Sequence, residues 1–88
     1  MLQITPSAGE FLYAVLERSQ APADAAIRLE IEGDALSSRV DQPRPGDATL
    51  TYEGRNVLVL DEQVAQLLDG IILDVEAGAK GDSLVLMH

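Results

Sequence analysis

The sequence contains no cysteine among its 88 residues. This absence excludes disulfide bonds, thiolate nucleophiles and the cysteine-ligated sites that hold zinc or iron–sulfur clusters. It does not indicate a compartment, because a chain without thiols tolerates both oxidising and reducing surroundings. Histidine is nearly absent as well, since His88 is the only one. A single imidazole forms neither a metal site nor a catalytic base without converging partners, so His88 alone predicts no chemistry.

Basic residues are also scarce. Six Lys and Arg stand against 15 Asp and Glu, which gives a net charge of −9. Phosphate binding needs a basic face, so we expect neither nucleic acid nor an anionic membrane as a partner. No apolar run approaches the ~20 residues of a membrane-spanning helix, and the N-terminus lacks the pattern of a secretory signal. We therefore expect a cytoplasmic protein.

Aromatic residues make up only 3% of the chain, whereas hydrophobic residues make up 47%. A buried core is therefore possible, and it must consist mainly of Ile, Leu, Val and Ala side chains. The length favours one domain over residues 1–88, because a second domain would be too small to build a core of its own.

The usual signatures of catalysis are missing. Gly78 and Gly81 fall in an apparent hairpin turn with no helix after it, so they form no phosphate-binding loop. Asp69, Asp74 and Glu76 come near the end of a short helix, but the spaced array of a calcium loop is absent. The serines lack a nucleophile elbow and a histidine base: Ser7, Ser19, Ser37, Ser38 and Ser83. We expect no enzyme, no catalytic, cofactor-binding or metal site, and no cofactor.

The first half of the chain predicts a helix over residues 6–18. Thr5 can cap it with Pro6 at the first helical position, and Ser7 with Glu10 offers a capping box as the alternative start. One face is apolar at helical spacing: Ala8, Phe11, Leu12, Val15 and Leu16.

The alternating residues 27–31 predict a strand that follows this helix. Its apolar residues should face the core, and Arg28, Glu30 and Glu32 should face water. Residues 35–42 are either a short edge strand or an irregular crossing, and residues 43–47 form a stiff proline turn. Arg39 and Arg44 flank this weak segment and mark either a contact surface or ordinary solvated side chains.

The second half predicts a hairpin of residues 49–52 and 57–60 with a four-residue loop. Asp61 should cap a helix over residues 62–68, with Glu62 in its first turn and Gly70 as its stop. The buried stripe of this helix should be Val64, Leu67 and Leu68. Strands over residues 71–75 and 83–87 should flank a turn at 77–82. This order is typical of an α+β domain with two helices on a mostly antiparallel or mixed sheet.

The apolar strand Leu84–Met87 lies close to the end of the sequence. At a sheet edge, such a strand offers backbone groups and side chains to a partner. One hypothesis is therefore self-association through this strand, and the alternative is that the strand is simply part of the core. The sequence names no other protein partner.

Several motifs occur in an order and spacing that resemble one known family. They are Ile4-Thr5 with Ala8, the Arg28-Leu29 strand, Pro43-Arg44-Pro45-Gly46-Asp47, Val57-Leu58-Val59-Leu60-Asp61, Leu67-Leu68-Asp69-Gly70 and Leu73-Asp74-Val75. Together they resemble the HesB-like domain, the fold of the A-type iron–sulfur cluster carriers. The similarity runs over most of the chain.

The departures from that family concern its metal site. The carriers hold iron or a cluster with one cysteine in a loop after the first long strand and two in a Cys-Gly-Cys tail. Here the strand of residues 27–31 runs into Gly33-Asp34-Ala35, so the stretch for the first cysteine looks deleted. The sequence also stops at His88, where a carrier continues into its tail. No residue of the family's cluster site can therefore be assigned to a position here.

The resemblance thus implies a HesB-like domain without the ligating cysteines. The leading hypothesis is a non-catalytic module for protein interaction or scaffolding. One alternative is an accessory partner of a cysteine-bearing carrier in iron–sulfur cluster assembly. Another is weak binding of iron through carboxylates, with His88 assisting.

Overall fold

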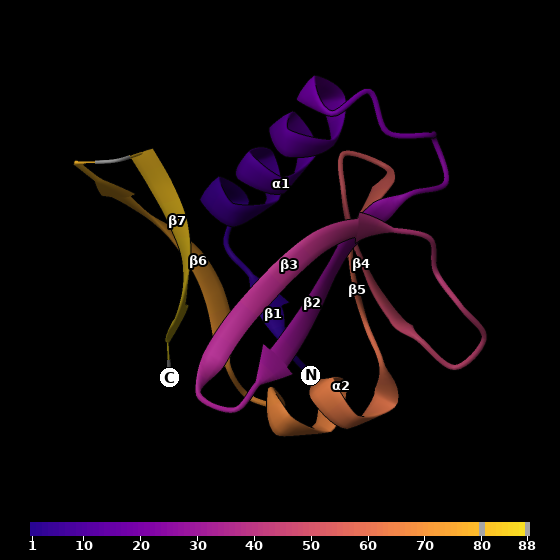
Figure 1. The fold of residues 1–88 in the computed structure, drawn as a ribbon, viewed down its shortest axis with the longest axis vertical. Coiled ribbons are helices and arrows are strands. Elements are labelled where there is room, and N and C mark those ends of the chain that lie inside the picture. Colours follow the sequence, from indigo (N-terminus) through magenta and orange to yellow (C-terminus); the bar gives the residue numbers. More distant parts are fainter. Residues whose placement is uncertain (80, 88) are drawn as a thin grey trace.

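The computed structural model describes residues 1–79 and 81–87, in which two helices cover two separate sheets (Figure 1). One sheet has the strand order β1 (Gln3–Ile4), β6 (Ile72–Gly78), β7 (Gly81–Met87). The other has the order β3 (Ala35–Asp41), β2 (Ala26–Glu32), β5 (Arg55–Leu60), β4 (Ala48–Tyr52). The helices are α1 (Pro6–Arg18) and α2 (Glu62–Leu67). The predicted α+β class with two helices is confirmed.

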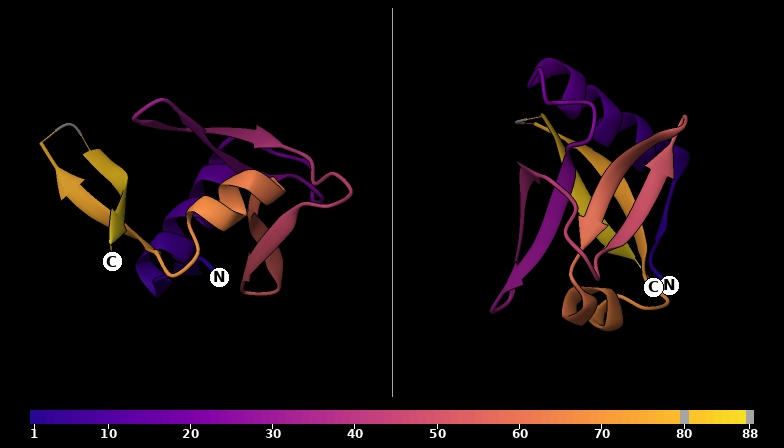
Figure 2. Two further views of the ribbon diagram at one scale, coloured as in Figure 1. Left: turned by 90° about the horizontal axis from the view of Figure 1, so that it is seen from below. Right: turned by 90° about the vertical axis from the view of Figure 1, so that its right-hand side faces the viewer.

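Helix α1 begins where the sequence predicts. The Thr5 side chain accepts a hydrogen bond from the amide of Ala8 (3.1 Å), so Thr5 is the cap, with Pro6 as the first helical residue. Leu12 and Leu16 are buried with Ala8, and Phe11 is half-buried. The helix packs against β4 and β5 of one sheet and against β6 of the other. It therefore holds the two sheets together (Figure 2).

Both sheets are mixed. In one, β2 pairs antiparallel with β3 and parallel with β5, which pairs antiparallel with β4. In the other, β6 pairs parallel with β1 and antiparallel with β7. Side chains from both sheets share one aliphatic core under α1, with Leu29, Leu58 and Leu73 fully buried. Leu73 thus brings β6 into the core that the two sheets share.

Two tight turns join neighbouring strands. Of the segment predicted as an edge strand or an irregular crossing, residues 35–41 form an edge strand, β3, which reaches β2 through a two-residue turn at Gly33-Asp34. The predicted four-residue loop between β4 and β5 is wrong, because Glu53 and Gly54 alone make the turn. Both have positive φ (53° and 76°), the geometry that matches the twist of paired strands, so Arg55 already belongs to β5.

Helix α2 begins as predicted, since the Asp61 carboxylate accepts a hydrogen bond from the amide of Val64 (2.8 Å). Its buried face differs from the prediction. Val64 and Leu68 are buried, but Leu67 is 64% exposed. The helix has six residues, and it packs on the side that Val64 shares with the half-buried Ala65. Leu67 falls outside that side.

The β6–β7 hairpin is longer than expected, because β6 extends to Gly78 and β7 begins at Gly81, where the sequence predicts a turn. It projects from the rest of the molecule, at the left of Figure 1. Lys80 and His88 lie outside the described residues, so the proposed contribution of His88 to a metal site is not addressed. Neither helix in the described part of the chain is long and apolar enough to cross a membrane.

Candidate functional site

Arg28 is the one charged residue of the described chain that is buried as a whole residue, although its place in β2 predicts exposure to water. It is only 3% exposed, because the turn of residues 43–47 folds over it. Its guanidinium donates to Asp41 Oδ2 (2.7 Å), to Asp47 Oδ2 (2.7 Å) and to the carbonyl of Gln42 (3.2 Å). The amide of Arg44 also donates to Asp47 (2.7 Å). Strand β2 is therefore exposed to solvent only at its C-terminal end, and hydrogen bonds from Arg28 hold the proline turn against it.

The charges around Arg28 stabilise one another. The hydrogen bond from Arg28 holds the pKa of Asp47 below its usual value, and it does the same to the pKa of Asp41. The Arg28 pKa is raised, mainly by the hydrogen bond to Asp47. Every partner is a turn or strand residue, and the guanidinium is closed off from solvent. This cluster therefore stabilises the turn over β2 and leaves no room for a substrate.

Arg39 and Arg44, which the sequence marks as a possible contact surface, belong to the rim of the same cluster. Arg44 lies 3.1 Å from Asp41, and Arg39 lies 3.6 Å from Asp41 and 3.4 Å from Glu30. Both side chains are more than half exposed. Pairs of this kind contribute little to stability, and they leave Arg39 and Arg44 largely neutralised.

The acidic residues near the end of α2 do not form a metal site. Asp69 contacts the Met1 ammonium group. Asp74 accepts hydrogen bonds from the Thr5 hydroxyl (2.7 Å) and the Val75 amide (2.8 Å), which lower its pKa. Within residues 1–79 and 81–87, no three His, Cys, Asp or Glu side chains are grouped so that they could hold a metal ion.

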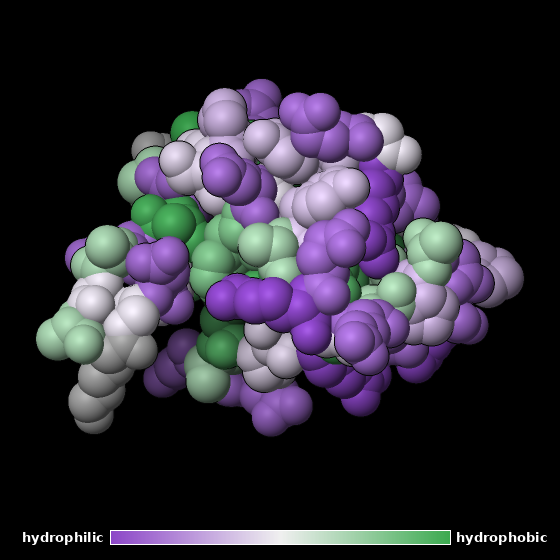
Figure 3. Space-filling view, turned by 90° about the horizontal axis from the view of Figure 1, so that it is seen from above, coloured by the Kyte–Doolittle hydropathy of each residue, from purple (hydrophilic) through white to green (hydrophobic). Residues whose placement is uncertain are grey.

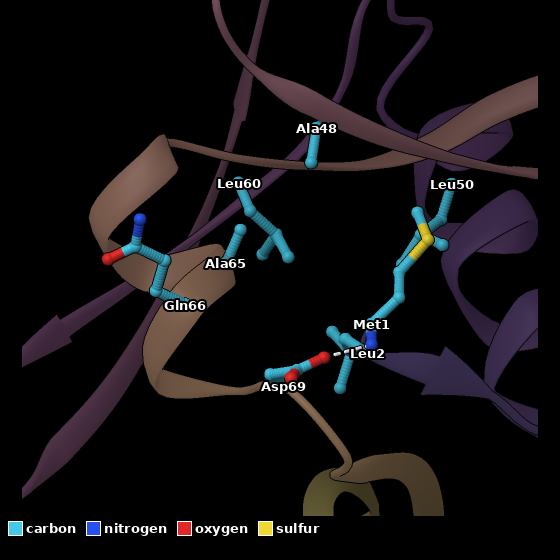
Figure 4. A pocket seen from close by; sticks show the side chains of 8 residues that line it. All are labelled: Met1, Leu2, Ala48, Leu50, Leu60, Ala65, Gln66 and Asp69. Atoms are coloured by element: carbon cyan, nitrogen blue, oxygen red, sulfur yellow. Dashed lines mark hydrogen bonds and ion pairs between the residues drawn. The ribbon is translucent and has the colours of Figure 1, made fainter.

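An apolar pocket of about 530 Å³ lies between α2, β4, β5 and the N-terminus. Figure 4 shows Leu60, Ala65 and Ala48 on its walls, and Met1 beside Leu50. Its polar groups are Gln66 and Asp69, and Asp69 is paired with the Met1 ammonium group. The pocket therefore presents no free charge or convergent polar set that would orient a ligand.

The outer edge of β7 has backbone groups that pair with no other strand among the described residues. The amide of Thr5 donates to the Leu73 carbonyl (3.0 Å), so Leu73 directs its backbone towards β1. Its cross-strand neighbour Leu86 therefore belongs to a non-hydrogen-bonded pair. Backbone groups alternate along an antiparallel pair, so those of Asp82, Leu84 and Leu86 point away from β6. They lie at the free edge of the sheet.

A groove separates this edge from the other sheet. It has a volume of about 250 Å³ and runs between the two edge strands β7 and β3. Its lining residues are Phe11, Leu29, Leu36, Ser37, Ser38, Ser83 and Leu84. Figure 3 shows a recess with apolar surface between the β6–β7 hairpin, at the left, and the body of the molecule. Three of the serines considered as nucleophiles thus lie on the walls of this groove, with no described histidine nearby.

The fold was compared with known proteins. No protein-family model matches the chain, and no curated protein matches it significantly in sequence. Solved structures do match. The crystal structure of Escherichia coli SufA, described as involved in the biosynthesis of iron–sulfur clusters, has a TM-score of 0.75 and 18% identity. The match covers 99% of this chain and 84% of SufA. The chain has the HesB-like fold.

Two further structures agree. The crystal structure of IscA with a [2Fe-2S] cluster gives a TM-score of 0.71 over 100% of this chain and 85% of IscA. The solution structure of a protein from Aquifex aeolicus gives 0.74 over 99% of this chain and 90% of that protein. Both are 18% identical. The resemblance found in the sequence motifs is therefore confirmed for the fold, in a chain that has no cysteine.

The HesB-like fold also locates the place where the resemblance sets the first cysteine. That place follows the first long strand, β2, which here turns at Gly33-Asp34 directly into β3. Glu32 pairs with Ala35 across this turn. Only Gly33 and Asp34 lie between the two strands at this point.

Proposed function

We propose that this chain is a non-catalytic interaction module with the HesB-like fold, which does not hold an iron–sulfur cluster itself. The observation that supports this most directly is the chain's lack of thiolate ligands, together with the two-residue turn at Gly33-Asp34 in place of a ligand loop. We further propose that it acts in the cytoplasm. Iron binding through Asp69, Asp74 and Glu76 is not proposed, because Asp69 and Asp74 are engaged with different partners.

The proposed contact surface is the free edge of β7. Leu86 and Met87 are each 39% exposed there, and the strand has unpaired backbone groups. Proteins usually protect long edge strands with Lys, Pro or a bulge. Residues 81–87 contain neither Lys nor Pro, and the register with β6 is unbroken. An edge of this kind is suited to pairing with another chain.

A second candidate is an accessory partner of a cysteine-bearing carrier in cluster assembly. The likeness to SufA and IscA over almost the whole chain favours it. The two candidates differ in the partner, since only the second predicts that a cysteine-bearing carrier co-purifies with the protein from its own cells.

The test of both is anaerobic reconstitution with ferrous iron and sulfide, followed by desalting, visible absorption and metal analysis. We expect no retained colour and no stoichiometric iron. Retained iron and sulfide in a fixed ratio to protein would contradict the proposal, because ligands other than cysteine would then hold a cluster. A cysteine-bearing carrier with the HesB-like fold, treated in parallel, is the positive control.

A further inference from the structure

We infer that the groove between β7 and β3 binds an extended, basic segment of a partner protein, which adds to β7 as a new strand. This inference rests on the proposed function and specifies its partner class. The free edges of the two sheets face the same groove, and both are edge strands by their order in the sheets. An added strand would therefore extend the β1-β6-β7 sheet towards β3.

The hydrogen bonds available to such a strand follow from the register. Asp82, Leu84 and Leu86 direct their amide and carbonyl groups to the open side of β7, as derived above from the pair Leu73 and Leu86. The same alternation applies to β3, where the two-residue turn makes Glu32 and Ala35 a hydrogen-bonded pair. Both walls of the groove therefore offer unpaired backbone groups.

The floor of the groove selects apolar side chains. The half-buried Phe11 of α1 lies at its base next to the fully buried Leu29 of β2, and the half-buried Leu36 and Leu84 lie on the two walls. Side chains of an added strand alternate between its two faces. Every second residue of the bound segment should therefore be apolar and point towards Phe11, while the residues between them remain near solvent.

The charge around the groove selects basic residues. Phe11 also lines an adjoining hollow of about 760 Å³, whose charged residues are Glu10, Asp82 and Arg18. Two carboxylates and one guanidinium thus line the hollow next to the groove, on a chain with a net charge of −9. A second copy of the chain would bring another −9 and repel the first. A basic partner segment is complementary, so we favour it over self-pairing of β7.

The probe is a seven-residue capped peptide, the length of β7, with alternating lysine and valine. A peptide with glutamate in place of lysine is the matched control. Titration by isothermal calorimetry at low salt should give binding of the lysine peptide and at least about tenfold weaker binding of the glutamate peptide. Equal affinities, or no binding of either peptide, would overturn the inference.

Amide hydrogen exchange gives a readout that is specific to the register. With the lysine peptide at ten times its Kd, exchange at the amides of Leu84 and Leu86 should slow about tenfold, because these amides exchange freely only in the unbound protein. The Val85 amide faces β6 and should change little. Protection confined to residues outside β7 would place the peptide elsewhere and refute strand addition.

Two variants isolate the backbone contribution. Leu86→Pro removes an amide that points to solvent, which an edge strand tolerates, and it should reduce binding at least about tenfold. Leu86→Ala keeps the amide and should bind nearly as the parent does. If Leu86→Pro does not fold, lysine peptides methylated on either the valine or the lysine amides decide the matter on the parent protein. If the peptide adds to β7 as a strand, at least one of these two methylated peptides must fail to bind.

Charge and self-pairing are tested separately. Asp82→Asn should weaken binding of the lysine peptide and should not weaken binding of the glutamate peptide. Asp24→Asn, in the exposed α1–β2 loop, should change the affinity for neither peptide.

Sedimentation equilibrium should show a monomer at the concentrations used, and a dimer that the peptide does not dissociate would overturn the choice of occupant. If the lysine peptide does not bind and reconstitution leaves no cluster on the protein, this binding site is refuted but the proposed function is not. If the protein retains a cluster, the proposed function is refuted, whether or not the peptide binds.

Discussion

Replacement of Arg28 by methionine should destabilise the fold more than any other single change of a charged side chain. The substitution removes the donor of hydrogen bonds to Asp41, Asp47 and the Gln42 carbonyl. It leaves Asp47, whose side chain is 6% exposed, as a buried carboxylate held only by the Arg44 amide. Removal of one partner from a buried ion pair costs about 3–5 kcal/mol. This is a large part of the ~4–13 kcal/mol expected for a chain of this length.

The assay is urea unfolding followed by circular dichroism, with thermal unfolding as a second measurement. A loss of 3 kcal/mol should lower Tm by roughly 12 °C or more in a domain of this size. The matched control is Arg39→Met, since Arg39 lies directly opposite Arg28 on β3. Its side chain is 55% exposed, so the control should cost less than about 1 kcal/mol.

The double variant Arg28→Met with Asp47→Leu tests the cause. A buried ion pair replaced by apolar residues of similar volume often costs little. The double variant should therefore be more stable than Arg28→Met alone. If the two single losses simply add within about 0.5 kcal/mol, the pair is not coupled and the role assigned to Arg28 is wrong.

Three further outcomes follow from the structure. Because the native pKa of Asp47 is lowered, its stabilisation is present above about pH 4 and lost as the pH falls further, so unfolding midpoints should drop there in the parent and less in Asp47→Asn. Gly9→Ala should destabilise α1 by about 1–3 kcal/mol, despite alanine's better helix propensity, because the new Cβ would overlap Tyr52 Cδ1. In a Tyr52→Ala background, where the ring is gone, Gly9→Ala should instead stabilise the fold. Thr5→Ala removes the cap of α1 and should cost about 1 kcal/mol, with faster hydrogen exchange at the amide of Ala8 as the local readout.

The elements that the sequence predicts correctly depend on neighbouring residues. Thr5 and Pro6 begin α1, and Asp61 begins α2, because a cap and the amides it binds lie within one helical turn. The errors arise where distant segments meet. Arg28 follows the alternation of an exposed strand position, but its burial depends on a turn that begins 15 residues later at Pro43. Leu67 fits the helical spacing, yet the side on which α2 packs decides its exposure.

The candidate site depends on an arrangement that no local pattern encodes. The sequence predicts that Leu84–Met87 is a strand and names a sheet edge as one of its possible places. It does not predict that β3 is the edge of a second sheet and faces the same groove. The signal that was available is the composition of residues 81–87, which lack the Lys and Pro that usually protect an edge.

The HesB-like fold forms here in a chain without cysteine, because its stability rests on other residues. The fold rests on the aliphatic core around Leu29, Leu58 and Leu73 and on the hydrogen bonds from Arg28. None of these residues lies in the two-residue turn at Gly33-Asp34, where the resemblance places the first ligand. The turn at Gly33-Asp34 joins β2 and β3 into a continuous hairpin outside the core. The same hairpin brings β3 into position as one wall of the groove, so the segment in which the resemblance sets a ligand also shapes the surface that we propose for partner binding.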